Sequence, residues 1–225
     1  NWERIVMSLF SYIQGKDIKT ALHIGAYTGE ELSNYASWGF KKVIWVEANP
    51  QIYVELCENL SKNNHGVENI TFNELISDKD DEPTDFHLYY WQDNRGMSSI
   101  HKLISGSAGQ ISAEECEKRF YVNTINLNSI TIDTLFERNN LDFDIDFVNV
   151  DTQGSELLVF SGATKILKNV KYINSEATFF SHDYENGVYF NELYDYLKKF
   201  GFVHIGNPSV SGDTAWGDSF FEKGV

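Results

Sequence analysis

Two stretches, HIGAYTGEEL at residues 23–32 and KKVIWVEANP at residues 41–50, decide the fold of this chain. Each begins as a short apolar strand and ends in polar residues that open a helix. This pattern predicts the first half of a nucleotide-binding α/β unit. Gly25 allows close approach of the backbone to a ligand, and Glu47, at the end of the second strand, can bind ribose hydroxyls. We therefore expect a nucleotide-derived cofactor over these two strand ends.

The rest of the chain continues this alternation of strands and helices. Apolar segments predict strands at residues 20–25, 43–46, 70–76, 86–91, 121–132, 145–150, 172–177, 201–205 and 215–222. Helical spacing of apolar residues predicts helices around residues 5–13, 32–36, 52–60, 155–160, 163–167 and 190–197. The pattern indicates an α/β fold with a mostly parallel, doubly wound sheet and a C-terminal antiparallel hairpin.

The domain organisation follows from the same segments. Residues 1–19 are expected to form a helix that packs on the domain, and residues 20–225 to form a single domain. Within it, residues 86–132 are interpreted as an inserted lid region. The Ser/Gly-rich residues 94–112 would be a mobile active-site loop.

Composition narrows the classes of partner. The net charge is −15, which disfavours nucleic acid and acidic membrane surfaces and favours neutral or cationic substrates. No apolar run is long enough for membrane insertion, and no signal peptide is visible. Cys57 and Cys116 have no metal-like or redox spacing, which indicates free thiols in the cytoplasm. The chain starts with Asn rather than Met, which is consistent with part of a longer multidomain protein.

The glycine spacing in the first turn bears on the cofactor. Dinucleotide sites use G-x-G-x-x-G, whereas Gly25 and Gly29 enclose three residues, including Ala26 and Tyr27, whose side chains disfavour a pyrophosphate. A cofactor without a pyrophosphate, such as S-adenosylmethionine (SAM), fits better. A nicotinamide-dependent oxidoreductase and a non-catalytic Rossmann-like binding module remain alternatives.

Carboxylates follow two further strands. Asp151 ends the strongly apolar strand at residues 145–150, and Glu176 ends the strand at residues 172–177. Open α/β sheets bind ligands at the carboxyl ends of their strands, so these two side chains should converge on one crevice. Glu156 either caps the helical segment near Ser155 or belongs to the same site.

Several blocks of this sequence resemble those of the FkbM family of SAM-dependent methyltransferases, and they follow one another in the same order. They are HIGAYTGEELSNY, WVEANP, NRGMSSI, ITIDTLF, VDTQGSELLVFSGA, INSEAT and WGDSFF, and they extend from about Ala21 to Glu222. Tyr27 stands where relatives carry His or Asn, and Asn149 stands where many carry Lys. The resemblance implies a Rossmann-like class I methyltransferase fold with SAM as cofactor.

The resemblance also implies roles for cofactor-binding residues. The backbone of Gly25, Ala26, Tyr27 and Gly29 would pass beneath the methionine part, and Glu47 and Asn49 would lie beside the ribose. Ser77 and Asp78 lie where the adenine is usually bound, although Asp78 also suits a turn. Glu31 would reach the amino-acid tail or compensate a helix dipole. Ser98 and Ser99, in the lid, would touch cofactor or substrate.

The implied reaction is O-methylation of a sugar or glycan hydroxyl, with a non-sugar secondary metabolite as the alternative acceptor. Alignment of oxygen, carbon and sulfur supplies part of the rate, and a general base helps because an alcohol is a poor nucleophile. Asp151 is the first candidate for this base, Glu176 the second and His182 the third. No metal is predicted, because spacing shows no third ligand beside Asp151 and Glu176.

Overall fold

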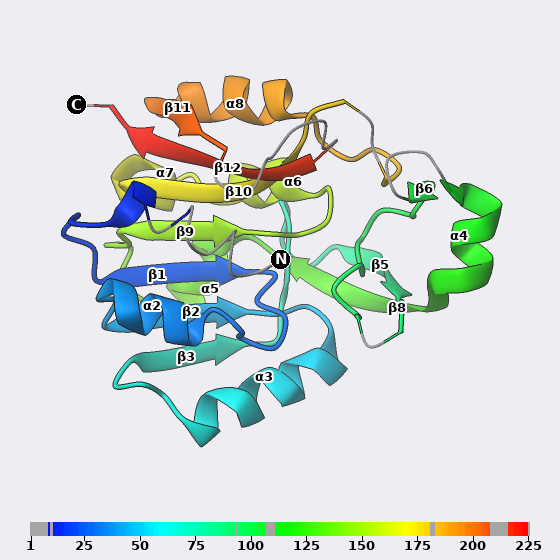
Figure 1. Ribbon diagram of the computed structural model, residues 1–225, viewed down its shortest axis with the longest axis horizontal. Coiled ribbons are helices and arrows are strands. Elements are labelled where there is room, and N and C mark those ends of the chain that lie inside the picture. Colours follow the sequence, from blue (N-terminus) through cyan, green and yellow to red (C-terminus); the bar gives the residue numbers. More distant parts are fainter. Residues whose placement is uncertain are drawn as a thin grey trace.

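The computed structural model of the protein describes residues 9, 11–92, 94–106, 111–180, 183–207 and 216–224. A seven-stranded sheet in the order β3-β2-β1-β9-β10-β12-β11 forms its centre (Figure 1). The strands are β1 (Thr20–Ile24), β2 (Lys42–Val46), β3 (Glu68–Phe72), β9 (Phe147–Val150), β10 (Tyr172–Thr178), β11 (Phe202–Gly206) and β12 (Trp216–Lys223).

The direction of the strands confirms the predicted topology. β3, β2, β1, β9 and β10 are parallel, and β12 runs antiparallel between β10 and β11. β1, β2 and β9 lie in the middle of the sheet and are mostly buried, which explains why they are largely apolar in the sequence. The sheet is therefore doubly wound with a C-terminal antiparallel pair, as expected of a Rossmann-like methyltransferase fold.

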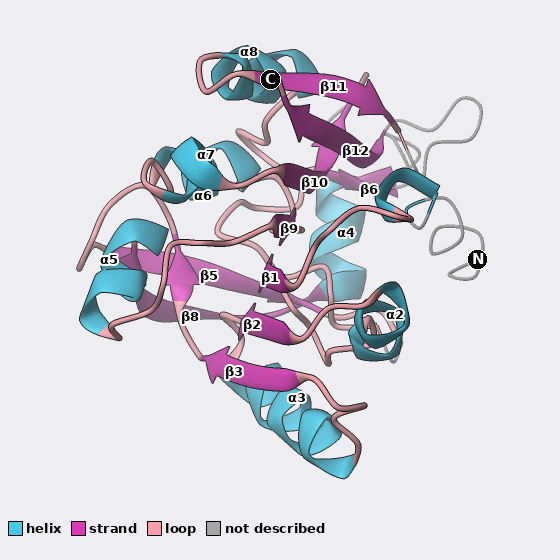
Figure 2. Cartoon of the chain, turned by 90° about the vertical axis from the view of Figure 1, so that its left-hand side faces the viewer, coloured by secondary structure: helices cyan, strands magenta, loops and turns pink. Residues whose placement is uncertain are grey.

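Helices cover both faces of this sheet (Figure 2). One face packs against α2 (Leu32–Trp38) and α3 (Pro50–Lys62), with Tyr35 and Leu56 among the buried contacts. The other face packs against α5 (Ile132–Arg138), α6 (Glu156–Ser161), α7 (Ile166–Asn169) and α8 (Phe190–Lys198). The second helical piece after β9 was expected at residues 163–167, so α7 begins three residues later than predicted.

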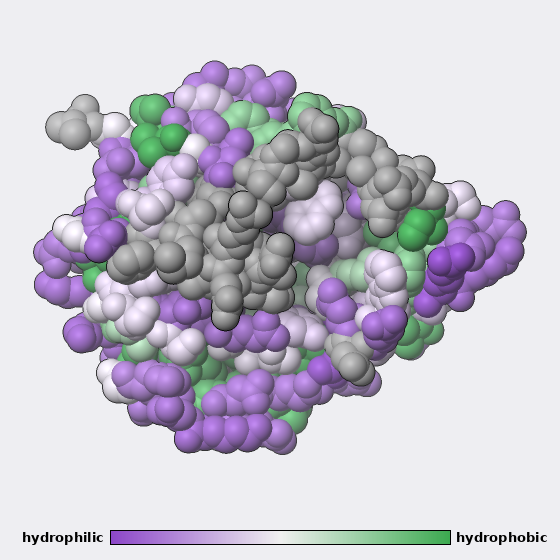
Figure 3. All heavy atoms as spheres, viewed as in Figure 1, coloured by the Kyte–Doolittle hydropathy of each residue, from purple (hydrophilic) through white to green (hydrophobic). Residues whose placement is uncertain are grey.

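An arm formed by residues 83–130 extends beyond the carboxyl ends of the central strands (Figure 1). Its antiparallel strands are β5 (Pro83–Tyr89) and β8 (Tyr121–Ile130), and the short β4 (Leu75–Ile76) pairs in parallel with the end of β8. The small hairpin β6 (Ser105–Gly106) and β7 (Ile111–Ser112) leads to α4 (Ala113–Phe120). The outer surface of this tip is strongly hydrophilic (Figure 3).

The structure divides one expected strand and adds two helices that were not expected. The strand predicted at residues 70–76 is two strands, since β3 ends at Phe72 and β4 joins the arm. Neither α4 nor α5 was predicted. α4 is stabilised by i,i+4 ion pairs between Glu114 and Lys118 and between Glu115 and Arg119. A search for apolar periodicity alone does not detect such a charged helix and assigns it to a polar loop.

The N-terminal helix is described only in part. Leu9 and residues 11–13 are helical, and Leu9 and Ile13 are buried against the α2 side of the sheet. The remaining residues of the predicted helix before Ser11 lie outside the described residues. Among the residues that the structure describes, no helix has the length and apolarity needed to cross a membrane.

Candidate active site

A cavity of about 990 Å³ lies at the carboxyl ends of the central strands, between the sheet and the arm. Its wall includes the turn after β1, the ends of β2, β9, β10 and β12, and the arm loop around Arg95. A parallel α/β sheet places its ligand at this edge. The volume is at the upper end of the range for small-molecule sites, about 300–1,000 Å³.

Gly25 has a specific steric role in this wall. Its φ is +77°, and a Cβ added there would lie 1.7 Å from the carbonyl oxygen of Asp151. Glycine is therefore required for contact between two strand ends rather than only for approach to a ligand. Gly29, with φ +75°, packs instead on Leu56 of α3, and neither Gly29 nor the buried Ala26 is among the described residues that line the cavity.

Glu47 is buried at the end of β2 and lines the cavity. Its Oε2 accepts a hydrogen bond from the Tyr27 backbone N–H (2.9 Å), and its Oε1 accepts one from the Asn49 N–H (2.8 Å). Burial raises the pKa of Glu47 to about 7, although these hydrogen bonds act in the opposite direction. The two bonds fix the carboxylate in one orientation at the cavity wall.

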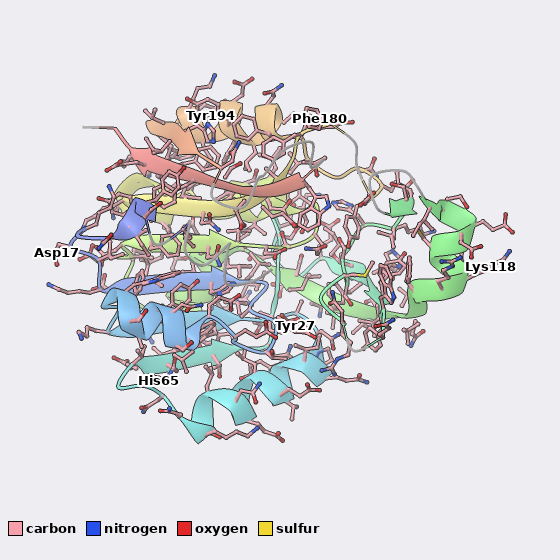
Figure 4. The ribbon with its side chains drawn as sticks, in the orientation of Figure 1. Asp17, Tyr27, His65, Lys118, Phe180 and Tyr194 are labelled. Atoms are coloured by element: carbon pink, nitrogen blue, oxygen red, sulfur yellow. The ribbon has the colours of Figure 1, made fainter. Side chains whose placement is uncertain are left out.

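The neighbours of Glu47 have distinct roles. Asn49 is the N-cap of α3, because its Oδ1 accepts from the N–H groups of Gln51 (3.0 Å) and Ile52 (3.5 Å). Tyr27, with φ +47°, lies in the turn after β1 and lines the cavity. Figure 4 shows it near α3 and the arm. Its hydroxyl accepts a hydrogen bond from the Arg95 N–H (3.4 Å).

The residues expected to bind adenine do not line the cavity. The Ser77 hydroxyl donates to Asp78 Oδ1 (3.2 Å), and the Ser77 N–H donates to the Ile130 carbonyl, so Ser77 belongs to the junction with β8. Ile52, Leu75 and Ile76 line the wall near Glu47 instead. The sequence interpretation missed them because apolar residues in a helix or strand resemble core residues.

Asp151 and Glu176 converge as predicted, and Gln153 bridges them. Gln153 Nε2 donates to Asp151 Oδ1 (2.6 Å) and to Glu176 Oε2 (2.9 Å). Gln153 itself has φ +57°, an uncommon conformation for a residue with a side chain. Asp151 is exposed to the cavity, whereas Glu176 is half-buried.

The two carboxyl groups differ in their electrostatics. Burial, followed by the charge of Asp151, raises the pKa of Glu176 well above its usual range. Burial also raises the pKa of Asp151, but hydrogen bonds from Gln153 and Glu176 oppose that rise. Both carboxyl groups are therefore harder to ionise than free ones, and the hydrogen bond from Gln153 favours the ionised form of Asp151.

The arm supports this bridge. The Tyr184 hydroxyl lies 2.8 Å from Gln153 Oε1 and 2.9 Å from the Met97 carbonyl oxygen. The Ser99 hydroxyl donates to the Gln153 carbonyl (2.8 Å), so Ser99 positions the turn, while Ser98 lines the cavity. Neither Gln153 nor Tyr184 was predicted as a site residue, because their roles depend on contacts between distant segments. The only sequence signal for Gln153 was its place in the family-like block VDTQGSELLVFSGA. His182, the third candidate base, lies outside the described residues.

Glu156 stabilises the turn after β9. Its buried carboxylate accepts from the N–H groups of Thr152 (3.0 Å) and Gly154 (3.0 Å), and burial raises its pKa to about 7. This geometry favours a positioning role for Glu156.

Glu31 lines the cavity on the α2 side, with its Oε2 3.9 Å from His23 Nδ1. Across the described ranges, no group of three or more His, Cys, Asp or Glu side chains could hold a metal ion.

Comparison with known proteins identifies the family. The profile described as "Methyltransferase FkbM domain" matches residues 23–203, well over half of the chain. The chain belongs to the FkbM methyltransferase family. S-adenosylmethionine is its cofactor, and the alternative of a nicotinamide-dependent oxidoreductase is set aside. Comparison with curated protein sequences finds no significant match.

Solved structures share the fold of this FkbM methyltransferase. One is an S-adenosylmethionine-dependent methyltransferase from Clostridium acetobutylicum ATCC 824, with 10% identity, 100% of this chain and 93% of that chain covered, and a TM-score of 0.53. Another is magnesium protoporphyrin IX methyltransferase (ChlM) from Synechocystis PCC 6803 with bound SAM, with 9% identity, coverage of 99% and 80%, and a TM-score of 0.52. At these identities the similarity extends to the fold alone.

The residues of this FkbM cavity fit SAM chemically. Glu47 presents an oriented carboxylate where ribose hydroxyls can donate to it, and Ile52, Leu75 and Ile76 provide an apolar wall nearby. Carboxyl groups around the cavity also suit the positive charge of a sulfonium.

Gly25 provides a stability prediction for this FkbM protein. We expect Gly25→Ala to lower the free energy of unfolding by about 3 kcal/mol or more, because it adds a backbone clash to the cost of a left-handed residue. Urea denaturation followed by circular dichroism measures the loss. Gly66→Ala is the matched control, because Gly66 has φ +75° and no atom within 4 Å of the added Cβ. Equal losses in both variants would show that the Asp151 contact is unimportant.

Proposed function

We propose that the protein transfers the methyl group of SAM to a hydroxyl of a sugar or glycan. The observation that carries this proposal is the Asp151–Gln153–Glu176 bridge at the cavity wall. It offers two adjacent carboxyl groups, both harder to ionise than free ones, and an amide that favours the ionised form of Asp151; this arrangement suits the removal of a hydroxyl proton. No lysine or arginine of the described chain lines this wall except Arg95, which forms a bidentate ion pair with Glu55.

We assign the cofactor contacts from this geometry. Glu47 would accept hydrogen bonds from the ribose hydroxyls, and Ile52, Leu75 and Ile76 would flank the adenine. Gly25 and Tyr27 would lie near the methionine part, with Ser98 facing them from the arm. Asn49 contributes indirectly, since it caps α3 and donates its N–H to Glu47.

The bound cofactor supplies an activated methyl group on a sulfonium. Methyl transfer to the acceptor hydroxyl would form a C–O bond and break the C–S bond, with S-adenosylhomocysteine as the leaving group. Asp151 takes the hydroxyl proton, while Gln153 and Glu176 keep its carboxylate oriented. General-base assistance of this kind typically contributes about 10²–10⁴ in rate.

Exposed aromatic rings support a sugar as the acceptor. Trp91 and Trp216 line the cavity with 48% and 53% of their surfaces exposed, and Trp91 stacks on Phe120. Flat apolar faces rimmed by carboxyl groups suit the C–H faces and hydroxyls of a sugar. The negative charge of the chain disfavours nucleic acid as a partner, and the two free cysteines support a cytoplasmic location.

The test is a screen of sugars and glycans with isotopically labelled SAM, read by mass spectrometry. A labelled methyl ether on a sugar is the expected product. Labelling of a non-sugar metabolite only would favour the alternative acceptor class. Absence of any labelled product from protein that binds SAM would favour a non-catalytic binding module.

Gln153 supplies a prediction about pH dependence. The hydrogen bond from Gln153 lowers the pKa of Asp151, so Gln153→Met should raise that pKa. A base must be deprotonated to act, and activity is lost as pH falls through its pKa. We therefore expect the acidic limb of the kcat–pH profile to move to higher pH, with kcat at neutral pH reduced by about tenfold or more.

The matched control is Gln92→Met. Gln92 also has positive φ, +54°, but does not line the described cavity. It should leave the pH profile unchanged. An unshifted acidic limb in Gln153→Met would show that Gln153 does not influence the base.

A further inference from the structure

Tyr184 lies between the arm and the bridge that joins Asp151 to Glu176. It belongs to the segment between β10 and α8 and lines the cavity. Its hydroxyl oxygen is 2.8 Å from Gln153 Oε1 and 2.9 Å from the carbonyl oxygen of Met97 in the arm. The side chain therefore contacts the bridging amide on one side and the arm on the other.

The amide of Gln153 has to face the two carboxyl groups with its NH₂ end. A glutamine amide donates through its nitrogen and accepts through its oxygen, whereas an ionised carboxylate only accepts. Nε2 faces Asp151 Oδ1 at 2.6 Å and Glu176 Oε2 at 2.9 Å, as this chemistry requires. Oε1 then points away from the acids, where it needs a donor.

Tyr184 supplies that donor. Burial, followed by the charges of Glu176 and Asp151, raises the pKa of Tyr184 well above its usual range, so the phenol keeps its hydrogen. The Met97 carbonyl can only accept, so the phenol hydrogen is shared between this carbonyl and Gln153 Oε1. The hydroxyl thus connects the orientation of the amide to the position of the arm.

Backbone contacts hold Tyr184 in this place. The Glu185 N–H donates to the Lys102 carbonyl of the arm (2.8 Å), and the Val188 N–H donates to the Gly154 carbonyl of the turn after β9 (3.2 Å). A Cβ added at Gly154 would lie 3.3 Å from the Cβ of Tyr184, so the two segments are closely packed. The phenol ring is therefore fixed relative to both the arm and the bridge.

The charges near Tyr184 are mostly acidic. Those that act on its phenol belong to Asp151, Glu156, Glu176 and Asp183, while His101, Lys102 and Glu185 lie in the arm or beside it in the chain. Replacing the neutral phenol by a phenyl ring removes none of these charges. A change in the titration of Asp151 in Tyr184→Phe would therefore report the lost hydroxyl rather than a lost charge.

We propose that Tyr184 is a positioning residue for methyl transfer, whose hydroxyl holds the amide of Gln153 with its NH₂ group towards the carboxylate of Asp151. This inference rests on the proposed function, because it takes Asp151 as the base. The phenol keeps its proton and acts only through Gln153. Without the hydroxyl, the amide is free to rotate and turn its oxygen towards the acids, which favours their protonated forms.

Carbon-13 NMR titration of the Asp and Glu carboxyl groups tests the inference without an acceptor or turnover. The protein is saturated with S-adenosylhomocysteine, and the Asp151 signal is identified by its loss in Asp151→Asn. We expect Tyr184→Phe to move the titration midpoint of this signal upward by about 0.5 pH unit or more, the effect of one neutral hydrogen bond. Tyr196→Phe is the control, because its hydroxyl donates to the Phe160 carbonyl (3.4 Å) away from the cavity wall.

A double-mutant cycle shows whether Tyr184 acts through Gln153. Gln153→Met alone should move the midpoint at least as far as Tyr184→Phe does. The combined variant should move it no further than Gln153→Met alone, since residues in one hydrogen-bond network are not additive. Shifts that add would show that Tyr184 acts on the acids independently of Gln153, and would overturn the inference.

An unchanged midpoint in folded Tyr184→Phe, checked by circular dichroism, would also overturn it. If that variant does not fold, the wild type decides. The side-chain amide protons of Gln153, identified by their loss in Gln153→Met, should exchange with solvent about tenfold more slowly than those of the exposed Gln14. Equally fast exchange would show an amide that is not held. Failure of these tests would leave sugar methylation by Asp151 standing, and a labelled-methyl screen without a sugar product would leave their result unchanged.

Discussion

Replacing Asp151 by Asn is expected to reduce kcat for methyl transfer by about 10²–10⁴-fold, the usual contribution of a general base. The carboxylate lies at the end of β9, exposed to the cavity, and the hydrogen bond from Gln153 favours its ionised form. Asn cannot take a proton from the acceptor. Its side-chain oxygen can still accept from Gln153, so the geometry of the turn should persist.

The measurement separates chemistry from binding. Single-turnover methyl transfer from labelled SAM gives the loss in rate, and calorimetric titration of SAM should give a dissociation constant within about twofold of the wild type. Asp78→Asn is the control, since Asp78 also follows a strand but lies outside the cavity wall. Unchanged turnover in Asp151→Asn would remove Asp151 from the role of base.

Replacing Glu47 by Gln should weaken SAM binding by about 10²-fold or more. Two hydrogen bonds to a charged acceptor contribute about 1.5–3 kcal/mol each, and 1.4 kcal/mol corresponds to tenfold in affinity. A second effect adds to this loss. One carboxylate oxygen faces the Tyr27 N–H and the other faces the Asn49 N–H. In either orientation a Gln amide therefore places its NH₂ group against a backbone donor.

Nucleoside probes show whether the loss involves the ribose. Wild-type protein should bind adenosine more tightly than 2′,3′-dideoxyadenosine, and Glu47→Gln should bind both with similar affinity. Glu68→Gln, at the exposed start of β3, should behave like the wild type. If Glu47→Gln still prefers adenosine as strongly as the wild type does, Glu47 does not bind the ribose hydroxyls.

Much of the fold could be predicted from local patterns. The apolar strands before Gly25 and Glu47 and the helix-opening polar residues after them depend on neighbours only a few positions away. The placement of Asp151 and Glu176 in one crevice followed from a general rule, because the carboxyl ends of parallel strands meet at one edge. α4 escaped detection because it has one short apolar face and relies on charged i,i+4 pairs.

The candidate site was less predictable where side chains contact distant segments. Gly29 resembles a cofactor-binding glycine in sequence, yet it packs against Leu56 of α3. Ser77 and Asp78 follow a strand as adenine-binding residues do, but β4 turns them towards β8 instead of the cavity. Gln153 and Tyr184 are 31 positions apart, and their contact exists only because the segment between β10 and α8 meets the turn after β9 in the folded chain.

The sequence by itself determined the order of strands and helices, the cofactor class and the pair of acids at the strand ends. These depend on hydrophobic periodicity, turn composition and strand polarity, all of which are local. Only the tertiary structure decided that Gly25 makes room for a backbone carbonyl and that Gln153 bridges the acids. Burial and charge–charge distance control these features, and both arise from segments that meet only after the chain has folded.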